Sequence, residues 1–164
     1  MICTKILGNI DSFDPAGRRV ETVDIEWSDA NKKIHRCVTS SGEEIGIRMD
    51  DTVLTRGLYE GDVIYEDPER IIVVNTPPCQ IIDIRIDNKY PAQIAKVCYE
   101  IGNRHAPLFR GEDNFQYIVP YDEPMLAMLK KIPHADAEVR TEKLNFLKKI
   151  STSAHHHHEH GHEH

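Results

Sequence analysis

Two adjacent prolines, Pro77 and Pro78, separate two kinds of hydrophobic pattern in a chain of 164 residues. Proline has no backbone N–H, so a proline pair cannot donate to a strand ladder, and it stiffens the chain. Before the pair, apolar residues follow the period of strands; after it, spacings of three and four residues also appear. The sequence therefore predicts a first domain at 1–76, a second at 77–150 and a tail at 151–164.

The first domain is predicted to be all β, as a small sandwich or barrel, because short β-rich runs alternate with turn residues. Val23, Ile25 and Trp27 alternate with acidic residues, and Trp27 is expected in the core. We expect this domain to dock a partner protein. The expected strands cover residues 2–10, 23–27, 34–38, 45–49, 63–65 and 71–74.

The second domain is predicted to follow the order β-α-β-β-α-β of a ferredoxin-like fold, which makes the fold class α+β. Asn88 is expected to cap the first helix, with Pro91 in its first turn, and Asp122 to cap the second. The expected strands are 79–86, 108–110, 115–119 and 135–144. The first helix should bury Ile94, Val97, Cys98 and Ile101, and the second should bury Met125, Met128, Leu129 and Ile132.

His105 is the titratable residue in this domain that is hardest to place. It follows Ile94 by eleven positions, which returns it to within about 20° of the same helix face. A single histidine there is either a core residue with satisfied hydrogen bonds or a ligand. Cys98 would lie roughly 10.5 Å away along the axis, too far to share a metal ion with it. If His105 binds a metal, its partners come from another element or another chain.

The tail ends in a run of ten residues that contains seven histidines, two glutamates and one glycine. It has no apolar residue, so it is predicted to be disordered. Neutral imidazole binds Ni²⁺, Cu²⁺ and Zn²⁺ well. A purification tag is the alternative, but the interruptions by Glu159, Gly161 and Glu163 favour a native segment. The candidate ligands are His155, His156, His157, His158, His160, His162 and His164.

Charge and hydropathy restrict the partners. The net charge is −7 with histidines neutral, and no basic stripe is present, so nucleic acid is not expected as a partner. No apolar run approaches the roughly 20 residues that span a bilayer, and no secretory signal is visible, so we expect a cytoplasmic protein with no membrane partner. The cysteines form no CxxC pair and are expected to be reduced.

Two other histidines are weaker candidates. His35 would share a strand face with Cys37, and the pair could supply two ligands, but a metal site needs more converging groups. His134 follows Pro133 in a turn. Both are interpreted as structural residues, although a contribution from either one is left open.

The segment Gly102-Asn103-Arg104-His105, followed by Ala106-Pro107-Leu108, resembles the G-N-R-H-x-P-L signature of the UreE family of urease accessory nickel chaperones. The segment 57–65, GLYEGDVIY, is similar to a Gly-Asp hairpin of that family, and the His-rich tail is a third shared feature. The resemblance implies an all-β first domain, a ferredoxin-like second domain and a variable tail. Some relatives carry further histidines after the strand at 115–119, where this chain has Pro120-Tyr121-Asp122.

The resemblance also implies a function. The chain would be a nickel metallochaperone, not an enzyme, in which two copies of His105 meet across a homodimer and tail histidines complete the coordination. It would deliver Ni²⁺ as cargo to a urease accessory GTPase and the urease apoprotein complex, although Zn²⁺ or Cu²⁺ can bind the same ligands. The alternative is passive storage of nickel or zinc by the tail alone. A metallohydrolase is not favoured, because only one fixed histidine is a candidate and no HExxH motif is present.

Overall fold

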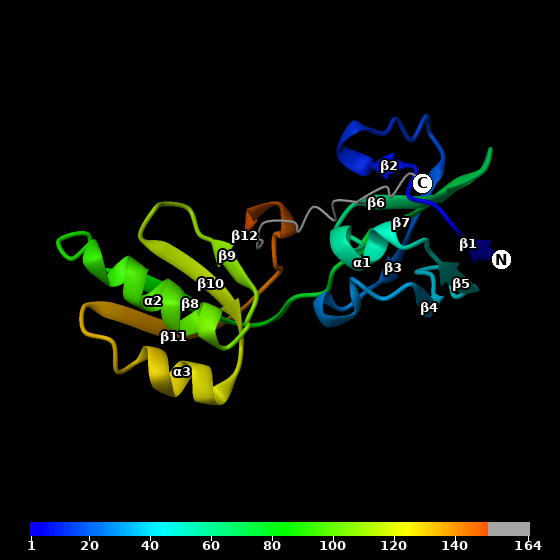
Figure 1. Ribbon diagram of the computed structural model, residues 1–164. Helices are drawn as coiled ribbons and strands as arrows, with labels where there is room; N and C mark the ends of the chain where they lie inside the picture. The colour runs from blue at the N-terminus through cyan, green and yellow to red at the C-terminus, as the bar shows by residue number, and fades with distance from the viewer. Residues whose placement is uncertain (151–164) are drawn as a thin grey trace, which may run out of the picture. The chain divides into compact units, whose positions relative to one another are not determined.

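The computed structural model describes residues 1–150, which form two compact units (Figure 1). The first unit contains Met1–Cys79 together with Thr141–Phe146, and the second contains Gln80–Arg140 and the residues from Leu147 onward. Within the described residues, no helix has the length and apolar content needed to cross a membrane. The predicted α+β class is confirmed for these residues; the predicted disordered tail, 151–164, lies outside them.

The first unit contains two small sheets. A four-stranded sheet has the order β2-β6-β7-β3 and a three-stranded sheet has the order β1-β5-β4. The strands are β1 (Ile2–Cys3), β2 (Gly8–Asn9), β3 (Arg19–Asp24), β4 (Ile34–Val38), β5 (Glu44–Arg48), β6 (Asp62–Glu66) and β7 (Arg70–Asn75). Short helices η1 (Ile10–Ser12), η2 (Trp27–Asp29) and α1 (Thr52–Arg56) connect them.

Three sequence predictions for this unit are wrong in detail. The expected strand 2–10 is two short strands, because β1 pairs with β5 in one sheet and β2 pairs with β6 in the other. Trp27 is only half-buried, because the chain turns into η2 and leaves the alternating pattern. The helix α1 was not expected at all. The core itself follows the period-2 rows, with Ile45 and Ile47 packed in one cluster with Ile72 and Val74.

The Gly-Asp hairpin is held by a buried carboxylate. Asp62 is fully buried and accepts hydrogen bonds from both Nη atoms of Arg56, at 2.7 and 2.8 Å, and from the backbone N–H of Tyr59 at 2.7 Å. Gly61 has φ of +84°, and a Cβ there would lie 2.9 Å from the side chain of Asn9. This motif therefore has a structural role in joining α1 to β6.

Glu21 of β3 is a second buried carboxylate. It accepts hydrogen bonds from the hydroxyl of Ser41 at 2.6 Å and from Nε of Arg19 at 2.9 Å, and Arg70 of β7 lies 3.4 Å away. The hydrogen bond from Ser41, assisted by those from Arg19 and Thr39, lowers the pKa of Glu21 from 4.5 to about 2 although burial opposes the change. The charged form of Glu21 therefore stabilises this unit.

The second unit has a five-stranded sheet with the order β11-β8-β10-β9-β12. Strand β10 lies between β8 and β9 and is antiparallel to both, so α2 crosses over one strand when it connects β8 to β9. This is the ferredoxin-like order, and that prediction is confirmed. The elements are β8 (Cys79–Ile86), α2 (Ala92–Asn103), β9 (Leu108–Arg110), β10 (Gln116–Pro120), α3 (Glu123–Leu129), β11 (Ala135–Glu142), η3 (Phe146–Lys148) and β12 (Lys149–Ile150).

Both helices of the second unit cover the same face of this sheet. Ile82, Ile84 and Ile86 of β8 belong to one buried cluster with Val97 of α2 and Leu129 of α3. The stripes predicted for the two helices supply this cluster, with Met128 and Ile94 at its half-buried margin. Cys98 was predicted in the same stripe, but it is only half-buried and is not a member of the cluster. The position of α2 is therefore fixed by apolar packing along its length.

The helix caps were predicted with mixed success. Asp122 does cap α3, because its Oδ2 accepts a hydrogen bond from the N–H of Met125 at 2.9 Å. Asn88 does not cap α2: the helix begins after Pro91, and the turn before it is held by Asp87, which accepts from the N–H of Lys89 at 2.9 Å.

The Glu21 network predicts acid sensitivity of the first unit. The folded-state pKa lies below the ordinary value of 4.5, so the stabilisation is complete above about pH 4.5 and is lost as the pH falls toward 2. Glu21→Gln should lower the free energy of unfolding at pH 7 by about 1–3 kcal/mol and flatten its decrease between pH 5 and 2. Urea unfolding at several pH values measures both effects.

The matched control is Glu44→Gln. Glu44 pairs with Arg36 on the surface, where both side chains are exposed, so its loss should change the free energy of unfolding by less than about 0.5 kcal/mol. Equal effects of the two substitutions would contradict the role given to Glu21.

Candidate metal site at the end of α2

His105 lies in a tight turn beyond the end of α2. The helix ends at Asn103, and the backbone N–H of His105 donates to the carbonyl of Gly102 at 3.0 Å. The buried stripe ends at Ile101, and His105 is exposed. The prediction that His105 ends the apolar stripe is therefore wrong, because the helical period was extended two residues beyond the helix.

The backbone of His105 is strained. Its φ is +55°, in the left-handed region that costs a residue with a Cβ about 1–2 kcal/mol. The turn is needed because Pro107 disfavours helical geometry at the residue before it, and β9 begins at Leu108. Ala16 and His134 also have a positive φ, so the strain marks the tight turn and does not by itself assign a role to His105.

The nearest side chains of α2 do not provide a second ligand. Glu100 bonds to Nζ of Lys96 at 2.6 Å and to Arg104 at 3.5 Å, and the Lys96 hydrogen bond is the main reason that its pKa is lowered. Burial raises the pKa of the Cys98 thiol, and a hydrogen bond with Tyr117 opposes this only in part. Because the thiolate is the metal-binding form, Cys98 is a poor ligand at neutral pH.

No group of three or more His, Cys, Asp or Glu residues within 1–150 is placed to hold a metal ion. A complete coordination sphere around an ion at His105 would therefore need ligands from another chain or from residues beyond 150. The seven tail histidines predicted as ligands, His155–His158, His160, His162 and His164, lie outside the described residues.

The weaker histidine candidates are engaged elsewhere. The Nε2 of His35 lies 2.9 Å from the carbonyl oxygen of Lys32, and Cys37 packs against the core of the first unit. His134 also has a positive φ, of +61°, but its ring stacks on Tyr90 with centroids 3.5 Å apart. These contacts agree with the structural interpretation of His35 and His134.

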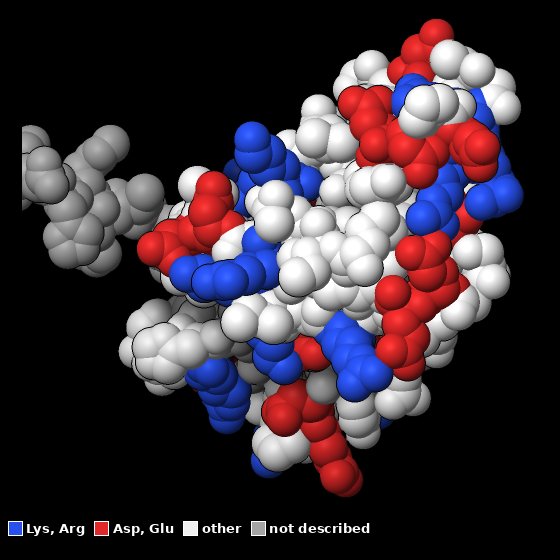
Figure 2. Space-filling view, turned by 90° about the vertical axis from the view of Figure 1, so that its right-hand side faces the viewer, with Lys and Arg blue, Asp and Glu red and all other residues white. Residues whose placement is uncertain are grey.

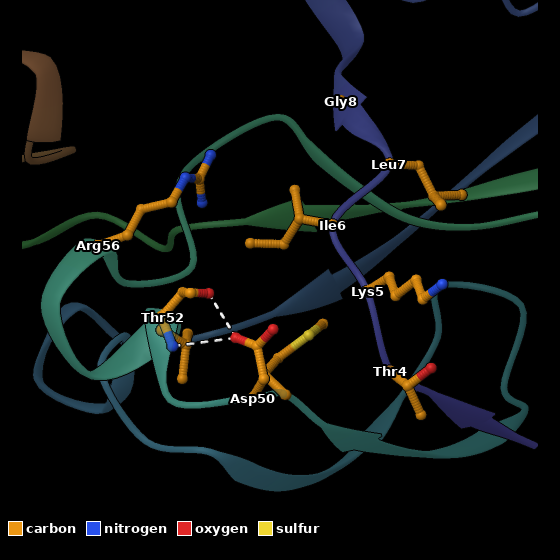
Figure 3. A pocket seen from close by; sticks show the side chains of 10 residues that line it. Thr4, Lys5, Ile6, Leu7, Gly8, Asp50, Thr52 and Arg56 are labelled. Carbon is orange, nitrogen blue, oxygen red and sulfur yellow. Dashed lines mark hydrogen bonds between the residues drawn. The ribbon is translucent and has the colours of Figure 1, made fainter.

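A pocket of about 470 Å³ lies in the first unit, between the segment 4–8 and α1 (Figure 3). Neither histidine nor cysteine lines it. Its one carboxylate, Asp50, is occupied, because Oδ1 accepts hydrogen bonds from the N–H and the hydroxyl of Thr52. The side chains that line this pocket are therefore unsuited to a nickel site.

Strand β12 brings the start of the tail to the same edge of the sheet as His105. Lys149 pairs with Phe109 and Ile150 with Leu108, in antiparallel register. The chain in β12 therefore runs back toward the His105 turn, and Ile150 lies opposite Leu108, the first residue of β9. Sequence reasoning missed this strand, because two residues are too few to show a period.

The strain at His105 predicts that glycine is better tolerated there in the metal-free protein. His105→Gly relieves a left-handed penalty of about 1–2 kcal/mol but adds about 0.4–1 kcal/mol of unfolded-state entropy. The free energy of unfolding should therefore rise by about 0.5–1 kcal/mol, measured by urea denaturation in the presence of a chelator. Asn103→Gly, in the last helical position, should instead lower it; a loss of stability at both positions would contradict the strain argument.

The two domains of a known family match the two parts of this chain. The UreE urease accessory protein N-terminal domain matches residues 3–76, and the corresponding C-terminal domain matches residues 80–164. The urease accessory protein UreE of Helicobacter pylori (strain P12) is 37% identical over 156 residues, which cover 95% of this chain and 89% of the relative. The Acetivibrio thermocellus protein of the same name is 41% identical over 131 residues, which cover 80% of this chain and 81% of the relative.

A third relative, from Helicobacter acinonychis, is 36% identical over 156 residues. The names of family and relatives describe accessory proteins of urease, which agrees with the prediction that the chain is not an enzyme. The chain belongs to the UreE family of urease accessory proteins.

Proposed function

We propose that this urease accessory protein is a Ni²⁺ metallochaperone, with His105 as the central ligand. The observation that carries the proposal is the place of His105 in the segment 102–108 that resembles the family signature: it is exposed in a tight turn, and no group of three or more His, Cys, Asp or Glu residues within 1–150 is placed to hold a metal ion without other segments. A histidine with these properties fits a site that is completed only when other segments approach. Delivery of nickel for urease assembly is the function that such an incomplete site serves.

A second copy of the chain supplies the first additional ligand. A two-fold interface brings identical residues together, so two exposed His105 side chains near the axis would give a pair of imidazoles. The exposed ring of Tyr99, on the solvent side of α2, offers apolar contact area for this homodimer close to the helix end. One Ni²⁺ ion per dimer is the expected stoichiometry of this pair.

The tail histidines supply the remaining ligands. His155 follows Ile150 by five residues, which span at most about 17 Å, and Ile150 is paired with Leu108, three residues after His105. The first tail imidazoles are therefore within reach of an ion held at His105. Imidazole ligands also accept Zn²⁺ and Cu²⁺, so the cargo is assigned through the urease role of the family.

The expected affinity fits a carrier. Structural zinc sites contribute about 10–16 kcal/mol, which opposes release, whereas a micromolar site corresponds to about 8 kcal/mol. We infer the urease accessory GTPase and the urease apoprotein complex as the acceptors, in the cytoplasm.

The outer face of the β1-β5-β4 sheet supports partner docking by the first unit. It carries the exposed apolar side chains of Ile2, Ile34 and Val38. Figure 2 shows uncharged surface bordered by acidic and basic side chains on the face of the molecule that it presents. Exposed Arg36 lies between Ile34 and Val38 on the same face and pairs with Glu44, so the face combines apolar contact area with charges that a partner could recognise.

The central prediction concerns His105→Ala. The exposed ring has little packing to lose, so the metal-free protein should keep its thermal midpoint within a few degrees. Ni²⁺ at 100 times the dissociation constant should stabilise the unsubstituted dimer by about 2.7 kcal/mol, and this gain should vanish in the variant when the tail histidines are absent. Thermal unfolding with and without Ni²⁺, together with calorimetric titration, measures both.

His134→Ala is the matched control, because His134 is also exposed with a positive φ. It should keep the full nickel response and one ion per dimer. If His105→Ala still responds to nickel in the tail-free background, the proposed site is wrong. If removal of the tail histidines alone abolishes all Ni²⁺ binding, the protein is a passive nickel store and the chaperone proposal is wrong.

A further inference from the structure

The first unit includes a short segment that follows most of the second unit in the sequence. The chain leaves the first unit after Cys79, forms the second from Gln80 to Arg140, and returns to the first for Thr141–Phe146, here called the return segment. Ordering each residue costs conformational entropy, so contacts with the rest of the first unit have to offset that cost. These contacts come from the Gly-Asp hairpin and from the end of β7.

Lys143 is the first anchor of the return segment. Its Nζ donates to Oε1 of Glu60 at 2.8 Å and to Oδ1 of Asn75 at 2.7 Å. The second carboxylate oxygen of Glu60 accepts from the backbone N–H of Thr76 at 2.5 Å. The side-chain amide of Asn75 donates to Asp24 at 2.6 Å. Both acceptors are therefore oriented by contacts within the first unit that do not involve Lys143.

Phe146 is the second anchor. Its ring stacks on the ring of Tyr59, with centroids 5.2 Å apart and planes inclined by 27°. The guanidinium of Arg56 lies 4.6 Å from the centroid of Tyr59 and is itself held by the buried Asp62. Between the two anchors, Leu144 is only 3% exposed. An ion pair, an apolar side chain and a ring stack thus hold the return segment.

We propose that Tyr59 and Glu60 form a releasable clasp for the return segment, which alternates between a docked state on the first unit and an open state. The side chains of Lys143 and Glu60 are 44% and 49% exposed, so water and salt ions can replace their ion pair. Among the strands of residues 1–150, β11 pairs with β8 alone. The clasp contacts can therefore open without breaking either sheet of the first unit, as expected of local opening.

A clasp at this place links events on the two units. The hairpin belongs to the first unit, whereas the return segment continues from β11 of the second. A molecule that takes the place of Lys143 or Phe146 on the hairpin opens the return segment, and an open return segment leaves the hairpin accessible by the same linkage. The clasp needs no metal ion and does not depend on His105.

Limited proteolysis of the full-length protein measures the open state. Chymotrypsin cleaves after aromatic residues, and cleavage after Phe146 requires the return segment to leave the hairpin. The rate follows the open population when opening and closing are faster than cleavage. Cleavage after Tyr65, within β6, reports unfolding of the whole first unit and serves as the reference. Mass spectrometry of the fragments gives both rates.

The charged anchor is tested with Glu60→Gln, which keeps an acceptor for Thr76, and with Lys143→Gln. Each should accelerate cleavage after Phe146 about threefold relative to the reference, as expected for a partly exposed ion pair. The double variant should also reach about threefold, not about ninefold, because both substitutions remove one contact. Sodium chloride at about 1 M should accelerate cleavage of the native protein about threefold and leave Glu60→Gln unchanged.

The ring stack is tested with Tyr59→Leu, which should accelerate cleavage after Phe146 about fivefold. The matched control combines Arg36→Gln with Glu44→Gln, which removes an exposed ion pair elsewhere on the first unit and should change neither rate.

Three outcomes would overturn the clasp. Unchanged cleavage after Phe146 in Glu60→Gln and Tyr59→Leu would show that the hairpin does not hold the return segment. Equal acceleration after Phe146 and Tyr65 would make the contacts merely structural. About ninefold acceleration in the double charge variant would show that Glu60 and Lys143 act separately.

Discussion

The packing of α2 against the even-numbered isoleucines of β8 is the constraint on which the second unit depends. Ile82, Ile84 and Ile86 present one apolar row, and Val97 and Ile101 of α2 are buried against it. Burial of each such side chain stabilises the fold by about 1.5–3 kcal/mol, so these contacts hold the helix along the row. After Ile101 no further buried residue stabilises a continuation of the helix. The chain then has to turn toward β9 within six residues, and His105 is the residue that takes the left-handed conformation in this turn.

This origin explains how one residue can be both exposed and well positioned. The turn is fixed from both sides, by the packed helix before it and by the pairing of β9 with β10 after it. His105 is exposed, as the proposed metal site requires of it. A glycine in the same turn would relieve the strain but would remove the imidazole that the proposed function needs.

Sequence patterns predicted the strands and helices in which several residues contact the same core. The rows in β5, β7 and β8 and the stripe of α2 were predictable, because each contains several residues that face one core. Single turns determine where α2 ends, why Trp27 is only half-buried and where α1 forms. The spacing of apolar residues does not predict such turns. The Gly102-Asn103 pair and Pro107 were the signals that could have ended the helix earlier. The proposed metal site takes ligands from a second copy of the chain and from residues beyond 150, so its ligand set came from family resemblance.

On the proposed function, the way in which the site is assembled also determines how it can release an ion. A cage built within one unit must open before an acceptor can reach the metal. Here the ligands belong to separate segments: the His105 turn, the same turn in a second copy and the chain beyond Ile150. The pairing of β12 with β9 involves two residues, and a ladder hydrogen bond contributes about 0.5–1.5 kcal/mol. Separating Lys149 and Ile150 from β9 therefore costs about 1–3 kcal/mol for two such hydrogen bonds, well below the roughly 8 kcal/mol of a micromolar site. Release should then begin with the tail ligands, and the acceptor should meet the ion while the two His105 side chains still hold it.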